Sequence, residues 1–217
     1  NVMGTTMNKN IRTHNLGFPR IGAKRELKRA LESAWAKRIS KTELTDIAKR
    51  IRAENWQIQQ AAGIDLIPSN DFSLYDQMLD TCALVGAVPE RFHWNDDLVK
   101  LSTYFAMARG AGESENDHAN SNYGVITALE MTKWFDTNYH YHWPELHRDQ
   151  TFKLACSKPF DEFEEALAIG IRTMPVIIGP LTFLLLAKTR GEKFDKLSLL
   201  PNLLSVYAVV LNRLHAQ

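Results

Sequence analysis

Apolar positions recur at helical spacing over two early segments of the chain. The first set consists of Leu27, Ala30, Leu31 and Ala34. Ser40 and Glu43 then form a capping-box pair, which predicts the start of a second helix. The apolar face of that helix consists of Leu44, Ile47, Ile51 and Ile58. Because residues three and four positions apart share one side of a helix, both segments are predicted to be amphipathic helices.

Short apolar runs between the helices are typical of buried strands. Strands are expected at 14–22, 64–68, 129–136, 151–157 and 174–178. Further helices are expected at 74–85, 96–108 and 160–170, from Pro180 onward, and along Leu204, Tyr207, Leu211 and Leu214. About five strand–helix units predict an α/β protein with a mainly parallel sheet. A (β/α)₈ barrel needs eight units, whereas an open sheet would be complete at this length, so the spacing leaves both open.

Two segments fall outside this pattern. Residues 109–123 are polar and rich in Gly, Asn and Ser, so we expect an exposed loop there. Residues 1–6 do not begin with Met, and we expect them to be a cloning scar, with Met7 a native start.

Composition excludes some classes of function. The net charge of +1 over 217 residues gives no general reason to expect nucleic-acid binding. The longest apolar stretch, 175–187, is interrupted by Gly179-Pro180 and is too short to span a bilayer, so no membrane is expected. Cys82 and Cys156 are far apart and form no CxxC, which fits the reducing cytoplasm.

The first candidate for chemistry is the segment Lys24-Arg25-Glu26-Leu27-Lys28, which follows Gly22 where a helix is predicted to begin. Cations are locally unfavourable at the positive end of a helix dipole. One explanation is an anionic ligand that uses the basic side chains and the helix N–H groups together. The other is a solvated, partly ion-paired helix start, and the pattern alone favours this second explanation.

Aromatic and polar residues are unusually dense over 130–142, which suits either a pocket wall or an aromatic core strand. His140 and His142, with Glu145 or His147, provide donors for a three-ligand zinc site, but their spacing matches no strong zinc motif. Satisfied pocket or surface histidines are the preferred interpretation.

Asn70 and Asp71 follow a predicted strand, in the position where α/β folds carry active-site loops. Asp71 suits either a ligand or general base there, or a cap on the next helix, and the cap is favoured.

Five motifs, in this order, closely resemble the N-terminal domain of the cobalamin-independent methionine synthases. They are LGFPRIG, KRELK, GIDLIPSNDFSLYD, EMTKWFDTNYHYHWPEL and PVIIGPLTFLLLAK. The resemblance runs from about His14 to the end of the chain, and EMTKWFDTNYHY is its most specific part.

The resemblance implies a fold and an activity. In this family two (β/α)₈ barrels face each other, and a methyl group moves from 5-methyltetrahydropteroyltriglutamate to homocysteine. Neither barrel needs cobalamin, and the C-terminal barrel holds a zinc ion that activates the homocysteine thiol. The family's folate-binding positions fall on Lys24, Arg25, Glu26 and Leu27, with Lys28 adjacent, and on Lys133. By the same resemblance residues 1–217 are the front part of the N-terminal barrel.

The resemblance also implies what this segment lacks. The zinc and homocysteine ligands belong to the C-terminal barrel, so no catalytic or metal-binding residue is expected here, and the isolated segment is expected to be inactive. Two alternatives remain open: a stand-alone folate- or anion-binding module, and a small metalloenzyme built on His140, His142 and Glu145.

Overall fold

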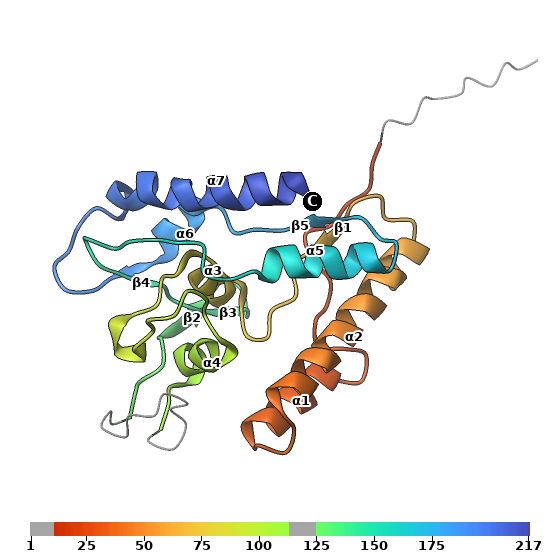
Figure 1. The fold of residues 1–217 in the computed structure, drawn as a ribbon, viewed down its shortest axis with the longest axis horizontal. Helices are drawn as coiled ribbons and strands as arrows, with labels where there is room; N and C mark the ends of the chain where they lie inside the picture. The colour runs from red at the N-terminus through yellow and green to blue at the C-terminus, as the bar shows by residue number, and fades with distance from the viewer. Residues whose placement is uncertain (1–10, 113–124) are drawn as a thin grey trace, which may run out of the picture.

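The computed structural model describes residues 11–112 and 125–217, and these form a mixed α/β chain (Figure 1). Its α-helices are α1 (Glu26–Trp35), α2 (Lys41–Ala61), α3 (Gln77–Val85), α4 (Leu101–Arg109), α5 (Lys158–Ala168), α6 (Pro180–Leu186) and α7 (Leu200–Ala216). Two 3₁₀ turns are η1 (Glu90–Phe92) and η2 (Lys196–Leu199). The strands are β1 (Ile67–Ser69), β2 (Met131–Lys133), β3 (His140–His142), β4 (Glu145–Leu146), β5 (Thr173–Pro175) and β6 (Lys188–Thr189).

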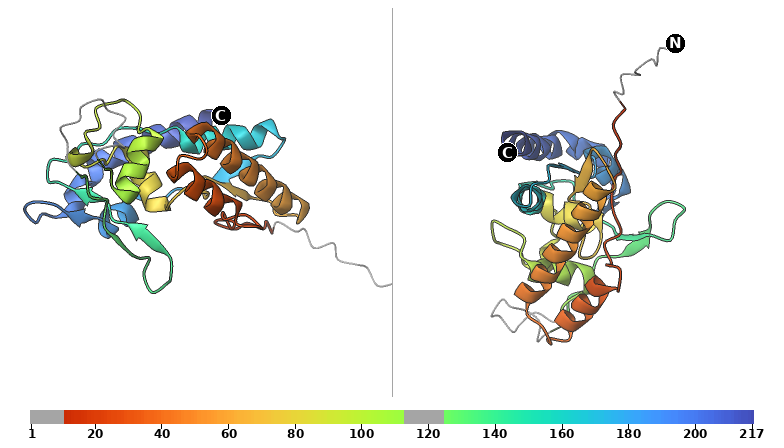
Figure 2. Two further views of the ribbon diagram at one scale, coloured as in Figure 1. Left: turned by 90° about the horizontal axis from the view of Figure 1, so that it is seen from below. Right: turned by 90° about the vertical axis from the view of Figure 1, so that its right-hand side faces the viewer.

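The strands form three short pairs. β1 lies parallel to β5, with Ile67 opposite Thr173, and an isolated bridge from His14 to Leu66 adds the N-terminal segment beside β1. β4 lies parallel to β6. β2 and β3 form an antiparallel hairpin that stands out from the body (Figure 2). The prediction of an α/β protein with a mainly parallel sheet is therefore confirmed only in part. The chain mixes helices and strands and two of its three strand pairs are parallel, but strand and helix do not alternate throughout the described residues.

Helices α1 and α2 pack side by side at one end of the molecule (Figure 1). The predicted capping box is present, since the Ser40 hydroxyl accepts from the Glu43 N–H and the Glu43 carboxylate accepts from the Ser40 N–H. Leu27 and Leu44 are fully buried between the helices. Burying each leucine side chain contributes about 1.5–3 kcal/mol to the free energy of unfolding, and this holds the two helices together. Ile58 was predicted to share this face, but it is exposed.

The largest core cluster lies under α3, α6 and α7. Its largest fully buried side chains include Phe160, Phe183 and Leu203. The apolar residues that predicted α7 do not all face the core, since Leu204 and Leu211 are exposed. Apolar residues occupy both sides of this helix, so spacing alone could not choose the buried side.

One helix in the described ranges, η2 and α7 taken together as Lys196–Ala216, is long and apolar enough to cross a membrane. Length and composition alone meet that test, and the core helices of many globular proteins meet it as well. A single helix of this kind is therefore weak support for a membrane segment.

Other boundaries differ from the prediction. Residues 151–157 form no strand; instead the N–H groups of Lys153 and Ala155 donate to the carbonyls of Val85 and Leu84. The expected strand at 14–22 is reduced to the bridge at His14. The expected scar lies outside the described residues, as does the expected loop beyond residue 112.

Candidate functional site

The connection between β1 and α3 is the centre of the candidate site. Asn70 directly follows β1 and adopts a left-handed backbone conformation with φ 60°. Its side chain donates to the Val176 carbonyl just beyond β5 (2.8 Å) and accepts from the Lys158 ammonium (2.9 Å). Asn is among the few residues that tolerate this conformation, so it suits a turn at the end of a strand.

Asp71 does not cap α3, so the favoured interpretation of this residue is wrong. The cap is Asp76, whose carboxylate accepts from the Leu79 N–H at 2.8 Å. Asp71 instead accepts from the Phe18 N–H at 2.8 Å and holds the chain that leads into α1. Burial raises the pKa of Asp71 above its usual value.

Arg20 fastens the same N-terminal segment to this connection. Its guanidinium donates to the carbonyls of Ser73 and Tyr75, each at 2.7 Å. A charged donor that bonds two carbonyls in a fixed fork orders both segments. Arg20 belongs to the LGFPRIG motif, but no sequence argument had singled it out.

The start of α1 is an unusual turn that exposes its basic side chains. Gly22 has φ +83°, and Arg25, just before the helix, is left-handed with φ 63°. The Glu26 carboxylate accepts from the Lys24 N–H at 2.8 Å. Hydrogen bonds from the N–H groups of Glu26 itself and of Lys24 hold the pKa of Glu26 below its usual value. Lys24, Arg25 and Lys28 are exposed.

Leu27 differs from its neighbours. Its side chain is completely buried between α1 and α2, and its N–H donates to the Ile21 carbonyl at 3.1 Å. Neither group is open to a ligand. A folate-binding role for Leu27 is therefore limited to positioning the helix.

Lys133 is the last residue of β2, opposite His140 in the hairpin, and its side chain is exposed. The hairpin bends back through Phe135, which has φ 48°, and Trp134 packs edge-on to Tyr141. The Tyr139 hydroxyl accepts from the Gln77 N–H at 3.2 Å, which ties the hairpin to the start of α3. The aromatic-rich segment is therefore divided: Tyr141 and His142 of β3 are buried in the core, as one of the two interpretations expected, whereas the residues around the turn of the hairpin are exposed.

The two predicted folate-binding groups thus attach to one connection from two sides. Arg20 bonds to it ahead of α1, and Tyr139 bonds to its end from the hairpin. Lys24 and Lys133 both extend from segments anchored there, although no direct contact joins them among the described residues.

His142 and Glu145 are already engaged, so the proposed zinc site does not form. One ring nitrogen of the fully buried His142 lies against the Asp76 carboxylate, and the other lies 3.0 Å from the Ala108 carbonyl. The Glu145 carboxylate pairs with Arg91 and Arg190. Burial alone would raise the pKa of Glu145, but the hydrogen bonds and charges of the two arginines together outweigh it and lower the pKa. His140 is exposed on the projecting hairpin, and no three potential ligands cluster within the described ranges.

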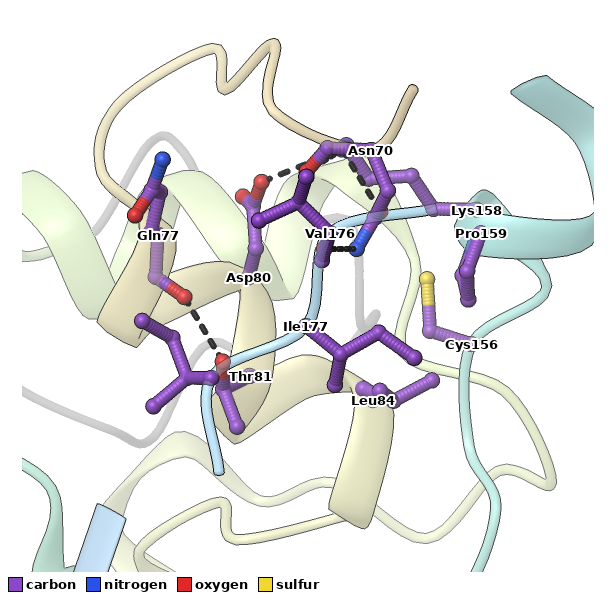
Figure 3. Close-up of a pocket in the computed structure, with 11 residues that line it drawn as sticks. Asn70, Gln77, Asp80, Thr81, Leu84, Cys156, Lys158, Pro159, Val176 and Ile177 are labelled. Atoms are coloured by element: carbon purple, nitrogen blue, oxygen red, sulfur yellow. Dashed lines mark hydrogen bonds and ion pairs between the residues drawn. The ribbon is translucent and has the colours of Figure 1, made fainter. Parts of the chain in front are cut away.

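A buried charge network lies next to Asn70 and was missed by the sequence argument (Figure 3). Lys158 lies 3.2 Å from the Glu162 carboxylate and 3.3 Å from the Asp80 carboxylate. Burial alone would lower the pKa of Lys158, but the two carboxylates outweigh it and raise the pKa. The same burial raises the pKa of Glu162. The i, i+4 spacing of Lys158 and Glu162 was visible, but the position of Asp80 beside them was not.

Two cavities adjoin this network. The smaller, about 20 Å³, is no larger than a water site and is bordered by Asn70, Asp80 and Lys158 (Figure 3). The larger, about 450 Å³, has an apolar floor that includes Phe72 and Tyr104. Residues of α2, α3, α4 and α5 line it, and none of its lining residues belongs to α1.

Comparison with known proteins decides the family. Residues 12–217 match the family described as "Cobalamin-independent synthase, N-terminal domain". The chain belongs to this family. The resemblance read from the five sequence motifs is therefore confirmed for the cobalamin-independent synthases.

Three relatives within the cobalamin-independent synthases carry the name 5-methyltetrahydropteroyltriglutamate–homocysteine methyltransferase. The Salinibacter ruber protein is 56% identical over 200 residues, covering 92% of this chain and 26% of the relative. The Mesorhizobium japonicum protein is 54% identical over 206 residues, with the same two coverages. The Flavobacterium johnsoniae protein is 50% identical over 211 residues, covering 95% and 26%. The chain thus spans about a quarter of the length of these relatives.

Proposed function

We propose that this chain is the folate-binding part of an enzyme that moves a methyl group from 5-methyltetrahydropteroyltriglutamate to homocysteine, making methionine. The names of the relatives give the reaction. The observation that carries the proposal is the start of α1, where exposed Lys24, Arg25 and Lys28 surround a helix N-terminus. The chain matches the family's N-terminal domain over nearly its whole length.

The geometry suits a triglutamate tail, which carries several carboxylates. Exposed ammonium and guanidinium groups at a helix N-terminus attract carboxylates through charge and directed N–H bonds. Lys133 would approach the ligand from the hairpin, which is anchored to the same connection through Tyr139. Glu26 serves the turn rather than the ligand, since its carboxylate is bonded to the Lys24 N–H.

We further propose that this chain is the front part of a (β/α)₈ barrel, in which β1 and β5 are neighbouring strands, and that the strands that complete the barrel lie elsewhere in a longer protein. The parallel pairing of β1 with β5, and of β1 with the His14 segment, supports this arrangement. The relatives are about four times longer, which leaves room for a second barrel as the intramolecular partner. The free thiols of Cys82 and Cys156 are in keeping with a cytoplasmic location.

The zinc ion implied by the family does not fit the residues described here. His142 and Glu145 already have protein partners, and Cys82 is completely buried. The groups that activate homocysteine would therefore come from the second barrel, and this chain would bind and orient the folate.

The test compares folates of different tail length on the full-length enzyme. Lys24→Ala, Arg25→Ala and Lys133→Ala should each raise the KM for the triglutamate substrate about fivefold, the effect of losing one exposed charge pair. The KM for the monoglutamate should change little. Lys193→Ala, an exposed lysine away from α1 and the hairpin, is the control. Equal losses for the two substrates would refute binding of the tail at these residues.

The remaining alternative is a folate- or anion-binding module that works at this length. The exposed cations at α1 favour it as much as they favour a substrate site within an enzyme. Calorimetric titration of the 217-residue chain with 5-methyltetrahydropteroyltriglutamate separates the two. Saturable binding would favour a self-sufficient site, whereas binding only by the full-length protein would show that the site needs the rest of the enzyme.

A further inference from the structure

Asp80 lies in the first turn of α3, beside the connection that joins β1 to this helix. Its side chain is 11% exposed and accepts from two hydroxyl groups, those of Ser73 at 2.8 Å and Tyr104 at 2.6 Å. The Lys158 ammonium lies 3.3 Å from the same carboxylate (Figure 3). Three polar partners satisfy a carboxylate that is largely removed from water, so Asp80 and the two hydroxyl groups fix one another.

The Tyr104 hydroxyl links Asp80 to the backbone of the connection. It donates to Asp80 and accepts from the Tyr75 N–H at 3.1 Å. Burial and the negative charge of Asp80 raise the pKa of Tyr104 well above its usual value, so the hydroxyl keeps its proton and remains a donor. The Tyr104 ring is buried and packs edge-on against Phe105, which holds its direction. Asp80 therefore holds Ser73 directly and Tyr75 through Tyr104.

Ser73 and Tyr75 are also the two residues that Arg20 bonds. Their carbonyls each accept from the Arg20 guanidinium at 2.7 Å. A guanidinium is a rigid fork, so it bonds two acceptors well only when their spacing matches its own. The Ser73 hydroxyl and the Tyr75 N–H help to hold these two residues in place, and both lead to Asp80.

Arg20 lies four residues before Lys24, and hydrogen bonds order the backbone that follows it. The Arg25 N–H donates to the Gly22 carbonyl at 3.1 Å, and the Lys24 N–H donates to the Glu26 carboxylate at 2.8 Å. Little backbone freedom is left between the guanidinium and the exposed cations ahead of α1. The position of Lys24 and Arg25 therefore follows the position of Arg20.

A purely stabilising role for Asp80 is the simpler alternative. Its ion pair with Lys158 would serve that role without any hydroxyl group. The alternative does not account for the second feature of the network, in which both hydroxyl groups lead to the two residues that Arg20 bonds.

We propose that Asp80 is a positioning residue for the binding of the folate tail, and that it acts through Ser73 and Tyr104 on the two carbonyls that hold Arg20. This inference rests on the proposed function, to which it adds the residues that determine where the cations ahead of α1 lie. A few exposed cations bind a flexible tail of carboxylates well only when they are held in place before the ligand arrives. Asp80 itself does not touch the ligand.

Steady-state kinetics of the full-length enzyme with the triglutamate and monoglutamate substrates test this. Tyr104→Phe removes the bridging hydroxyl and keeps the buried ring. It should raise the KM for the triglutamate about threefold, less than the loss of a whole cation, and leave kcat and the KM for the monoglutamate unchanged. Ser73→Ala removes the other hydroxyl and should give the same pattern. The matched control is Tyr207→Phe, a second buried tyrosine, whose hydroxyl donates to the Ile178 carbonyl; both KM values should stay the same.

A double-mutant cycle separates positioning from a general loss of stability. The cycle combines Tyr104→Phe with the pair Lys24→Ala and Arg25→Ala. If Tyr104 acts through these cations, its change should have almost no further effect on the KM for the triglutamate once they are gone. A general disturbance of the fold would add to the loss of the cations instead.

Three results would overturn the proposal. Tyr104→Phe and Tyr207→Phe would behave alike, or Tyr104→Phe would raise the KM for both substrates equally, or its effect would add fully to that of the two lost cations. In each case the proposed function stands if Lys24→Ala still distinguishes the triglutamate from the monoglutamate. If Lys24→Ala and Arg25→Ala show no dependence on tail length, the proposed function fails, and the role of Asp80 fails with it.

Discussion

Replacing Lys158 by methionine tests the buried charge network beside Asn70 most directly. Methionine keeps the apolar stem of the side chain and removes only its ammonium group. That group lies within 3.3 Å of both the Glu162 and Asp80 carboxylates, whose side chains are 4% and 11% exposed. The variant would leave two poorly hydrated carboxylates without this cation.

The magnitude follows from burial. Removing one partner of a fully buried pair costs about 3–5 kcal/mol. The Lys158 side chain remains 22% exposed, and Arg52 still lies 3.6 Å from Glu162. We therefore expect a loss of about 2–3 kcal/mol in the free energy of unfolding, somewhat less than for a fully buried pair.

Urea unfolding followed by circular dichroism at pH 7 measures this loss. The matched control is Lys153→Met, whose ammonium lies 3.7 Å from Asp97 with both side chains largely exposed, so its change should stay below about 1 kcal/mol. Lys158→Met with Glu162→Gln should recover part of the loss, because the second change removes a carboxylate that the first left unpaired.

The pH dependence provides a second check. Burial raises the pKa of Glu162, so in the folded protein this carboxyl binds a proton more readily than in the unfolded chain. A protonated Glu162 does not need the Lys158 cation. The loss caused by Lys158→Met should therefore shrink as the pH falls from 7 toward 4. An equal loss in Lys153→Met, or a loss that grows on acidification, would refute this account of the network.

Three further predictions concern the candidate site and its surroundings. Gly22→Ala should lower the free energy of unfolding by about 1–2 kcal/mol, since φ is +83° and an added Cβ would come within 2.2 Å of a Glu26 oxygen; Gly63→Ala, at φ +76° with open space around it, should cost less in the same urea titration. Glu145→Gln should lower the free energy of unfolding at neutral pH, because the folded protein lowers the pKa of Glu145 and so gains stability from the ionised carboxylate above its usual pKa. The wild type loses this contribution as the pH falls through the lowered pKa, so the unfolding curves of wild type and variant should converge in acid. His142→Leu leaves the buried Asp76 carboxylate without its ring partner and should cost about 3 kcal/mol by thermal unfolding, whereas His140→Leu on the exposed hairpin should be nearly neutral.

Local chemistry made the helices predictable. The structure confirms the Ser40–Glu43 capping box, the proline at the start of α6 and the apolar face of α1. Each of these features depends only on residues within one or two helical turns. Strand identity depends on partners far along the chain. Residues 151–157 are apolar and extended enough to suggest a strand, yet their N–H groups bond to the end of α3 instead.

The candidate site was predictable only in part, for the same reason. Lys24, Arg25 and Lys133 could be proposed because cations at a helix start and a specific motif are visible in the sequence. The residues that arrange the site act through contacts across dozens of positions, such as Asp71 with the Phe18 N–H and Arg20 with the Tyr75 carbonyl. No local pattern marks such pairs, and for Asp71 the local pattern favoured the wrong role.

These long-range bonds explain why the LGFPRIG and KRELK motifs belong together. The charged side chain of the first motif is not available to a ligand, because Arg20 is hydrogen-bonded to the connection after β1. The Phe18 N–H is hydrogen-bonded to the same connection, and Gly22 forms the turn that follows. Leu27 then fixes the helix in the core. With these groups engaged, Lys24 and Arg25 are left exposed on a short segment whose backbone is held at both ends. Cations positioned in this way lose less side-chain and backbone freedom on binding than cations on a loose loop, so a tail of carboxylates can be bound by a few exposed side chains.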